Sequence, residues 1–240
     1  MAEDHLRKEP LTNEQVRIAS KKHKEWAMVA TDYLARPLSH LLVKYTKITP
    51  NQITWFSFLL VLVAGYFLTL GGYGNILIAS LLAFGYNILD MADGIVARLQ
   101  GSSSLLGQWL DGVLGFIAFP ILIFCLAKGL NDQLALIVGM AAIVSYPLQF
   151  LFVHYYKSDI IKNNEKISIP GKFEWMRYLY GASFFYFFLL AAAIANQPLI
   201  VLWFWATFGN IYPLLILFSQ YSTLKKNQQE KNENLLQHRP

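Results

Sequence analysis

Three aspartates stand inside stretches of sequence that are otherwise apolar enough to cross a membrane. Asp90 and Asp93 lie in the run FGYNILDMADGIVARLQ, and Asp111 lies in the next run, LLGQWLDGVLGFIAFP. A carboxylate at the centre of a bilayer costs about 2.5–3.5 kcal/mol even on lenient insertion scales, so three of them at helical spacing need a compensating charge. A divalent cation compensates them most economically. The residues therefore predict a metal-dependent enzyme within the membrane.

The charge on these acids could be met by two kinds of partner. One is a buried network of ion pairs with Arg98 or Arg36, but single arginines leave part of the charge of three acids uncompensated. The other is a metal ion. Carboxylate oxygens are hard ligands that suit Mg²⁺, Mn²⁺ or Ca²⁺ and do not suit zinc. The single cysteine, Cys125, also excludes an intrachain disulfide and a zinc site of clustered thiolates.

Helical spacing brings the acids toward one another. Asp90 and Asp93 are three residues apart and Ala97 is four residues further along, so they share one face of a helix. Gly107 and Asp111 share one face of the next helix in the same way. Because the loop LQGSSS joins the two helices, Asp93 and Asp111 differ in depth by a few ångströms at about 1.5 Å per residue. Two antiparallel helices therefore present three carboxylates to one site near the membrane surface.

The composition is that of an all-α integral membrane protein. Hydrophobic residues make up 55% of the chain and charged residues 15%, and the mean hydropathy is +0.37. A transmembrane helix needs about 20 apolar residues. Six runs of this length predict six transmembrane helices, at 53–72, 74–97, 104–127, 133–154, 177–196 and 198–220.

Lys and Arg gather on one side of these runs, in the N-terminal segment, in the loop from Lys157 to Arg177 and after the last run. Lys128 is the only basic residue in a loop on the other side. By the positive-inside rule, this predicts a multi-pass protein of the cell membrane with both termini and the acidic site in the cytoplasm. The net charge of +5 is explained by these loops, so no nucleic-acid partner is expected. The polar first 25 residues do not predict a signal peptide.

The ends of the chain differ from its middle. Residues 13–46 carry apolar side chains at spacings of three and four among charges, which predicts an amphipathic helix in the cytoplasmic interface, kinked or split at Pro37. Thr49-Pro50-Asn51 predicts the start of the first span. The last 15 residues predict a solvated or disordered tail. The expected divisions are a cytoplasmic N-terminus (1–50), a six-helix catalytic domain (51–222) and a cytoplasmic tail (223–240).

The spacing of the acids resembles the motif of the CDP-alcohol phosphotransferase family, D-x2-D-G-x2-A-R-x8-G-x3-D-x3-D. Seven of its eight fixed positions are filled, by Asp90, Asp93, Gly94, Ala97, Arg98, Gly107 and Asp111. Pro50, Asn51 and Thr54 also look like the family's usual start of the first span. The resemblance extends over essentially the whole chain. It implies transfer of a substituted phosphate from a CDP-linked donor, lipid or not, to an alcohol, with release of CMP, by a homodimer in polar-lipid synthesis.

The resemblance also implies residue roles. Asp90, Asp93 and Asp111 would hold Mg²⁺ or Mn²⁺, with Asp90 and Asp111 catalytic. The nucleotide donor would be bound by Asp93 and by further matched positions, with Arg98 near its phosphates: Gly94, Ala97, Arg98, Gly107, Asn51 and Thr54. Asn51 and Thr54 have an alternative role as helix caps. Arg36 and Arg177 are the best candidates for an acceptor phosphate, against the alternative of ordinary positive-inside charge and contact with lipid headgroups.

The family's last aspartate falls on Gly115, which cannot act as the expected general base or as a ligand to a second metal ion. Three hypotheses follow. In the first, the acceptor needs no strong base, for example because it attacks through an already ionised phosphate or carboxylate; inositol phosphate, glycerol phosphate, serine and sugars are the candidate acceptors. In the second, His154, Asp159 or Glu174 replaces the base. In the third, the chain is a natural relative or an engineered variant that binds nucleotide or lipid without turnover. Loss of a general base costs about 10²–10⁴-fold in rate. A transporter using the acids is a further alternative, which the lack of repeats and broken-helix pairs disfavours.

Overall fold

The described part of the computed structural model comprises residues 11–20, 22–161, 175–176 and 178–237, and it contains helices and no strands. This confirms the prediction of an all-α protein. The elements, in chain order, are α1 (Asn13–Ala19), α2 (Trp26–Tyr45), α3 (Pro50–Leu70), α4 (Tyr73–Leu99), α5 (Leu105–Gly129), α6 (Gln133–Tyr155), the π-helical turn η1 (Tyr156–Ile161), α7 (Ala182–Ile194) and α8 (Leu199–Gln237).

Five helical stretches among the described residues are long and apolar enough to cross a membrane: α3, α4, α5, α6 with most of η1, and α8. The sixth apolar helix, α7, has 13 residues and is about 20 Å long, which is less than the roughly 30 Å of a hydrocarbon core. The predicted span at 177–196 is therefore too long, because the helix begins after Gly181 and ends at Ile194. A count of six spans stays a prediction.

The first long helix begins where the sequence predicts. The Thr49 hydroxyl accepts a 3.3 Å hydrogen bond from the Gln52 amide, and the Gln52 side chain accepts a 2.9 Å bond from the Thr49 amide. Pro50 then occupies the first helical position, where its missing N–H costs nothing. At the other end of α3, Gly71 has a φ of +66° and lies so close to Gly129 that a Cβ on Gly71 would overlap the Gly129 carbonyl. This contact fixes α3 against the end of α5.

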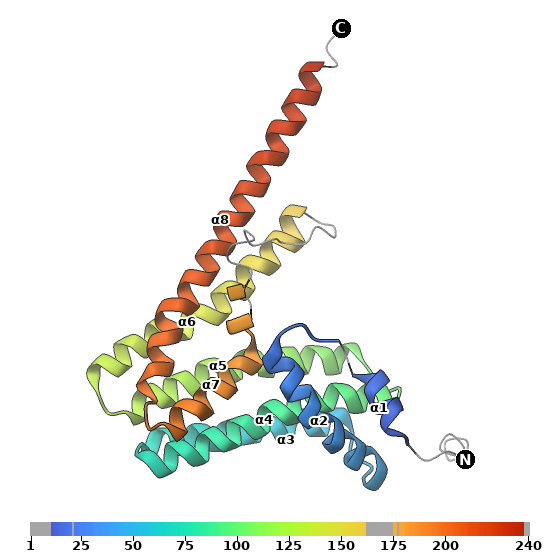
Figure 1. Cartoon of the computed structure of the whole chain (residues 1–240), viewed down its shortest axis with the longest axis vertical. Helices are drawn as coiled ribbons and strands as arrows, with labels where there is room; N and C mark the ends of the chain where they lie inside the picture. Colours follow the sequence, from blue (N-terminus) through green and yellow to red (C-terminus); the bar gives the residue numbers. More distant parts are fainter. Residues whose placement is uncertain (1–10, 21, 162–174, 177, 238–240) are drawn as a thin grey trace.

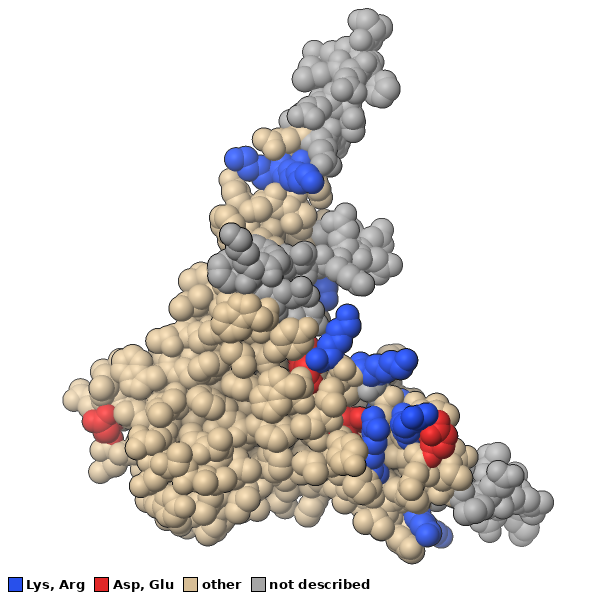
Figure 2. Space-filling view, viewed as in Figure 1, with Lys and Arg blue, Asp and Glu red and all other residues tan. Residues whose placement is uncertain are grey.

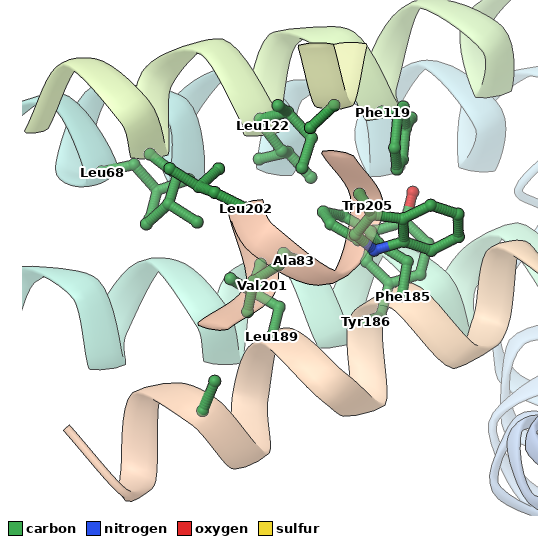
Figure 3. Packing of buried hydrophobic residues seen from close by; sticks show 14 of the residues in the cluster. Leu68, Ala83, Phe119, Leu122, Phe185, Tyr186, Leu189, Val201, Leu202 and Trp205 are labelled. Carbon is green, nitrogen blue, oxygen red and sulfur yellow. The ribbon is translucent and has the colours of Figure 1, made fainter. Parts of the chain in front are cut away.

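The long helices pack side by side around one apolar core. α3 lies against α4 and α5, α6 lies along α8, and α2 crosses α4 (Figure 1). Figure 3 shows the centre of the core, where the rings of Phe119, Phe185 and Trp205 meet between α5, α7 and α8. Trp205 is fully buried and Phe185 nearly so. The core holds in place the helices that carry the acids.

The N-terminal segment was predicted to be one helix that is kinked or split at Pro37, and the structure differs from this. α2 continues through Pro37. The break lies earlier in the chain, since α1 ends at Ala19 and α2 begins at Trp26. Proline leaves the carbonyl four residues before it without a partner. Because Pro37 and Tyr33 both lie on the exposed side of α2, water or headgroups can pair with that carbonyl. The helix therefore tolerates the proline.

The C-terminal segment is helical as far as Gln237, so of the two predicted alternatives, a solvated or a disordered tail, the disordered one is wrong up to that residue. The exposed side chains at 226–229 fit a solvated segment. Lys, Gln, Glu and Leu are good helix formers, and extending a helix that already exists requires no new nucleus. Figure 1 shows the end of α8 projecting beyond the other helices. On the face seen in Figure 2, Lys and Arg gather on the projecting part of α8 and at the end that carries α1 and α2, leaving a broad uncharged surface elsewhere.

Candidate active site

A cavity of about 610 Å³ lies where α3, α4 and α5 meet the N-terminal segment. The nine donor-site and metal-site residues predicted on these three helices all lie in its wall. They are Asn51, Thr54, Asp90, Asp93, Gly94, Ala97, Arg98, Gly107 and Asp111. Residues separated by up to 60 positions in the chain are thus brought to a single site.

The cavity is acidic at its centre. Asp90 and Asp93 project from the same face of α4, and the Asp90 carboxyl is close enough to the Asp111 carboxyl on α5 and to the Tyr86 hydroxyl to interact with both. Two carboxylates in contact repel each other unless a proton or a cation lies between them. Within the described ranges, no three acidic, His or Cys side chains are already gathered at metal-ligand spacing. The carboxylate oxygens of Asp90, Asp93 and Asp111 are hard ligands with excess negative charge, which fits Mg²⁺ or Mn²⁺. The three carboxylates would move closer together when the ion binds.

Thr54 positions one of the three acids. Its hydroxyl donates a 2.6 Å hydrogen bond to Asp93 Oδ2, and the two residues are 4% and 5% exposed. The helix start is capped by Thr49 instead, so the structure gives Thr54 no capping role. The bond ties α3 to α4 and leaves the other carboxylate oxygen of Asp93 for a further partner.

Asn51 lies against the glycine that opens α5. A Cβ added to Gly107 would lie 3.0 Å from Asn51 Oδ1 and 3.1 Å from Ser104 Oγ, which is tighter than side chains normally pack. The absence of a side chain at this position therefore allows the Asn51 amide to reach the cavity wall beside α5.

Arg98 connects the acidic site to the N-terminal segment. Its guanidinium folds back over Gly94, where an added Cβ would lie 3.2 Å from Nη1. Its Nε donates a hydrogen bond to the Ala19 carbonyl at the end of α1. The two terminal nitrogens are therefore the part of Arg98 left to bind a ligand, while Nε holds α1 against α4.

Some predicted residues lie elsewhere. Arg36 is not in the wall: it forms a 2.5 Å ion pair with Asp32 and donates a 3.2 Å bond to Ser20 Oγ. Arg177 lies outside the described residues. Neither of the two proposed substitute bases that can be located lines the cavity, since the His154 ring stacks on Phe150 and Asp159 accepts a bond from Ser158. Glu174 also lies outside the described ranges.

Gly115 lies near the acids but outside the cavity wall. A Cβ there would meet the Tyr86 hydroxyl at 3.8 Å, an ordinary contact distance. Tyr86 is buried and also interacts with Asp90, so its hydroxyl borders the place where the family motif would put a fourth carboxylate. The backbone at position 115 therefore accepts a Cβ without a clash.

The cavity also contains residues that sequence reasoning missed. They are His23, Met28, Met91, Ser102, Ser103, Ser104 and Gln108. The three serines precede α5, and a polar run at a helix start is a usable signal for a binding loop. His23 and Met28 carry no such signal, because only the folding of the N-terminal segment onto α4 brings them to the site.

A family model and two curated relatives match this chain. Residues 47–209 match the model of the CDP-alcohol phosphatidyltransferase family. Phosphatidylinositol phosphate synthase of Corynebacterium glutamicum is 37% identical over 78 residues, covering 32% of this chain and 34% of the relative. Archaetidylinositol phosphate synthase of Pyrococcus horikoshii is 38% identical over 82 residues, covering 34% and 42%. The matched stretches thus span less than half the length of these curated relatives.

Solved structures share the fold. Mycobacterium tuberculosis phosphatidylinositol phosphate synthase, solved with CDP-DAG bound, has a TM-score of 0.60 at 15% identity, covering 79% of this chain and 94% of the other. The same synthase in complex with manganese and citrate has a TM-score of 0.58 at 17% identity, covering 78% and 88%. Because the family model spans most of the sequence, including the three acids and the cavity-lining part of α3, the chain belongs to the CDP-alcohol phosphatidyltransferase family.

Proposed function

We propose that this protein transfers a phosphate-linked group from a CDP-linked donor to an alcohol, with release of CMP, in phospholipid or related polar-lipid synthesis. One observation carries the proposal: every matched motif residue lines the same cavity. Membership of the family supports the reaction type. The M. tuberculosis synthase solved with CDP-DAG supports a lipid donor of that kind.

The proposed acceptor is a phosphorylated polyol. Both curated relatives are named for making an inositol phosphate lipid, so inositol phosphate is the first acceptor to test. Such an acceptor carries its own ionised oxygens beside the hydroxyl that attacks, and these can take up the proton that the missing base would accept. This reasoning favours the hypothesis that no strong base is needed over replacement by His154 or Asp159, neither of which lines the cavity.

In the proposed mechanism, the acceptor oxygen forms a bond to the donor phosphorus next to the lipid, and the bond from that phosphorus to CMP breaks. The hydroxyl proton passes to an ionised phosphate oxygen of the acceptor. Asp90, Asp93 and Asp111 would hold Mg²⁺ or Mn²⁺. The bound cation would neutralise the diphosphate and stabilise the departing CMP. Thr54 orients Asp93, and the terminal nitrogens of Arg98 supply positive charge for the donor phosphates.

Release of CMP tests the reaction. Purified protein with Mn²⁺ and CDP-diacylglycerol is incubated with inositol phosphate, glycerol phosphate, serine and inositol in separate reactions. We expect CMP with a phosphorylated acceptor, and loss of at least about 10²-fold in Asp93→Asn, since an essential charged group is removed. The matched control is Asp132→Asn, because Asp132 caps α6 and lies outside the cavity wall.

The Gly115→Asp variant separates turnover from binding. If the unaltered chain releases no CMP with any acceptor and Gly115→Asp does, the chain is a relative that binds donor without turnover, and the enzyme proposal fails. If both release CMP, the fourth carboxylate is dispensable for this acceptor. Addition of EDTA is expected to lower the thermal midpoint, because it removes the cation that offsets repulsion among the acids.

We also propose a cell-membrane protein, dimeric as the resemblance implies, with the cavity and both termini in the cytoplasm. The support is the gathering of Lys and Arg at the end that carries α1 and α2 (Figure 2). Cysteines introduced at Lys22 and Gln133 in a Cys125→Ser background test the orientation. A membrane-impermeant thiol reagent on intact cells should label the second site alone. Cross-linking of purified protein tests the dimer.

A further inference from the structure

His23 lies in the link between α1 and α2, and its ring forms part of the cavity wall. Its Nε2 is buried and has no hydrogen-bond partner among the described residues. A buried polar nitrogen without a hydrogen-bond partner is unfavourable, because it has lost its bonds to water and gained none in return. His23 is therefore a basic residue in the wall of a polar cavity, and its Nε2 has hydrogen-bonding capacity that the described residues do not use. Because Nε2 is buried, the imidazole ring must turn before this nitrogen can face a ligand in the cavity.

Described residues on both sides of His23 are held by contacts with other helices. On one side, Ser20 Oγ accepts a 3.2 Å bond from Arg36, and the preceding Ala19 carbonyl accepts the bond from Arg98 Nε. On the other side, the Trp26 ring packs on Phe184 and Phe187 of α7, at centroid distances of 6.0 and 5.5 Å. Anchors three residues away in either direction restrict where the imidazole can lie. Its presence at the cavity is thus a consequence of packing.

The chemistry of the wall identifies the ligand group. Of the side chains that line the cavity, His23 and Arg98 are the basic ones. Arg98 uses Nε on the Ala19 carbonyl, so it has its terminal nitrogens left for a donor diphosphate that carries several acceptor oxygens. An imidazole N–H is a second hydrogen-bond donor that can bind a phosphate oxygen. Hydrogen bonds to charged groups are stronger than those between neutral groups.

We propose that His23 is a substrate-binding residue that donates a hydrogen bond to the diphosphate of the CDP-linked donor, next to Arg98. The inference rests on the proposed function, because it takes that donor as the ligand. It adds to the family motif a residue from outside the motif and outside the membrane-spanning helices. The N-terminal segment thereby becomes part of the donor site.

Titration calorimetry of the full-length protein in detergent with Mg²⁺ tests the proposal, with CDP and cytidine as the two probes. His23→Ala is expected to raise the Kd for CDP about 10- to 100-fold and to leave cytidine binding unchanged. His23→Gln, which keeps an N–H donor, should restore most of the CDP affinity. The control is His40→Ala: its Nε2 is also buried without a partner in the described chain, its Nδ1 bonds Asn13, and it does not line the cavity.

The possible results are distinct. Unchanged CDP affinity in His23→Ala overturns the inference, and so does an equal loss for CDP and cytidine, which would mean a distorted cavity. A loss of the same size in His40→Ala also overturns it, since the effect would then come from loosening the segment. If the unaltered protein with Mg²⁺ does not bind CDP at all, the proposed function fails, and the inference fails with it.

Discussion

Thr54 on α3 donates a 2.6 Å hydrogen bond to Asp93 on α4, and both side chains are almost completely buried. An acid that the sequence marks as a metal ligand is therefore oriented by a neighbouring helix. The orientation of the ligand and the packing of two spans depend on the same bond, so a change in one is expected to appear in the other.

Replacing Thr54 by valine keeps the shape of the side chain and removes the bond. The free energy of unfolding should fall by about 1.5–3 kcal/mol, the range for hydrogen bonds to charged groups, and the stabilisation by Mg²⁺ should shrink. Thermal unfolding in detergent with and without Mg²⁺ measures both. Ser57→Ala is the control, since this buried hydroxyl on the same helix bonds the Thr54 carbonyl and no acid. Equal effects in the two variants would contradict the role of Thr54.

Gly107 and Gly112 lie on the same helix and differ in what a methyl group would meet. At Gly107 the methyl would lie 3.0 Å from Asn51 Oδ1, and at Gly112 it would meet nothing within 4 Å. Gly107→Ala should displace Asn51 and weaken CDP binding several-fold. Gly112→Ala should leave CDP binding intact and raise stability by about 0.5–1 kcal/mol, the helical preference of alanine over glycine. Calorimetry measures CDP binding and thermal unfolding measures stability in both variants. Intact CDP binding in Gly107→Ala would contradict the role of the Gly107–Asn51 contact.

Arg98→Lys tests the connection to α1. A lysine ammonium is a single point of charge and cannot serve the Ala19 carbonyl and a phosphate with the geometry of a guanidinium. Hydrogen exchange of the amides at 19–25 should accelerate, and CDP should bind more weakly. Arg17→Lys is the control, because Arg17 forms an exposed pair with Glu14 that contributes little. If exchange in the link is unchanged in Arg98→Lys, the contact does not hold the segment.

Two tryptophans of α8 should differ sharply in how much each contributes to the free energy of unfolding. Trp205 is fully buried among aromatic rings, and Trp203 is 44% exposed. Trp205→Ala is expected to cost about 3–5 kcal/mol through the cavity it leaves. Trp203→Ala should change stability by about 0.5 kcal/mol. Comparable losses in denaturant unfolding would mean that the core is not centred where Figure 3 shows it.

The donor side of the site was predictable because its geometry is local. Residues three and four apart on one helix share a face whatever surrounds them, so Asp90, Asp93 and Ala97 could be placed together from spacing. The short LQGSSS loop then set Asp111 at a similar depth. Hydropathy likewise located the long helices, since their length follows from the thickness of the bilayer.

What the sequence did not reveal depends on contacts between distant residues. The Arg98–Ala19 bond joins positions 79 apart in the chain and brings His23 to the cavity. The spacing of large apolar residues in α2 predicted an interfacial helix, and three of these residues, Trp26, Tyr33 and Leu41, are exposed. The spacing did not show which face of α2 packs on the other helices. Small residues such as Ala35 and Ser39 pack inward. For α7, the uniform hydropathy of the run gave no indication that the helix starts only after Gly181.

The wall of the cavity has a consequence for how this chain is divided. A boundary drawn by hydropathy between 50 and 51 passes through the candidate site, because His23 and Met28 lie on one side of it and Thr54 on the other. A protein shortened to its transmembrane helices would keep every motif residue and lose one wall. The smallest functional unit is therefore the spans together with the segment that precedes them, and truncations should be designed around the cavity.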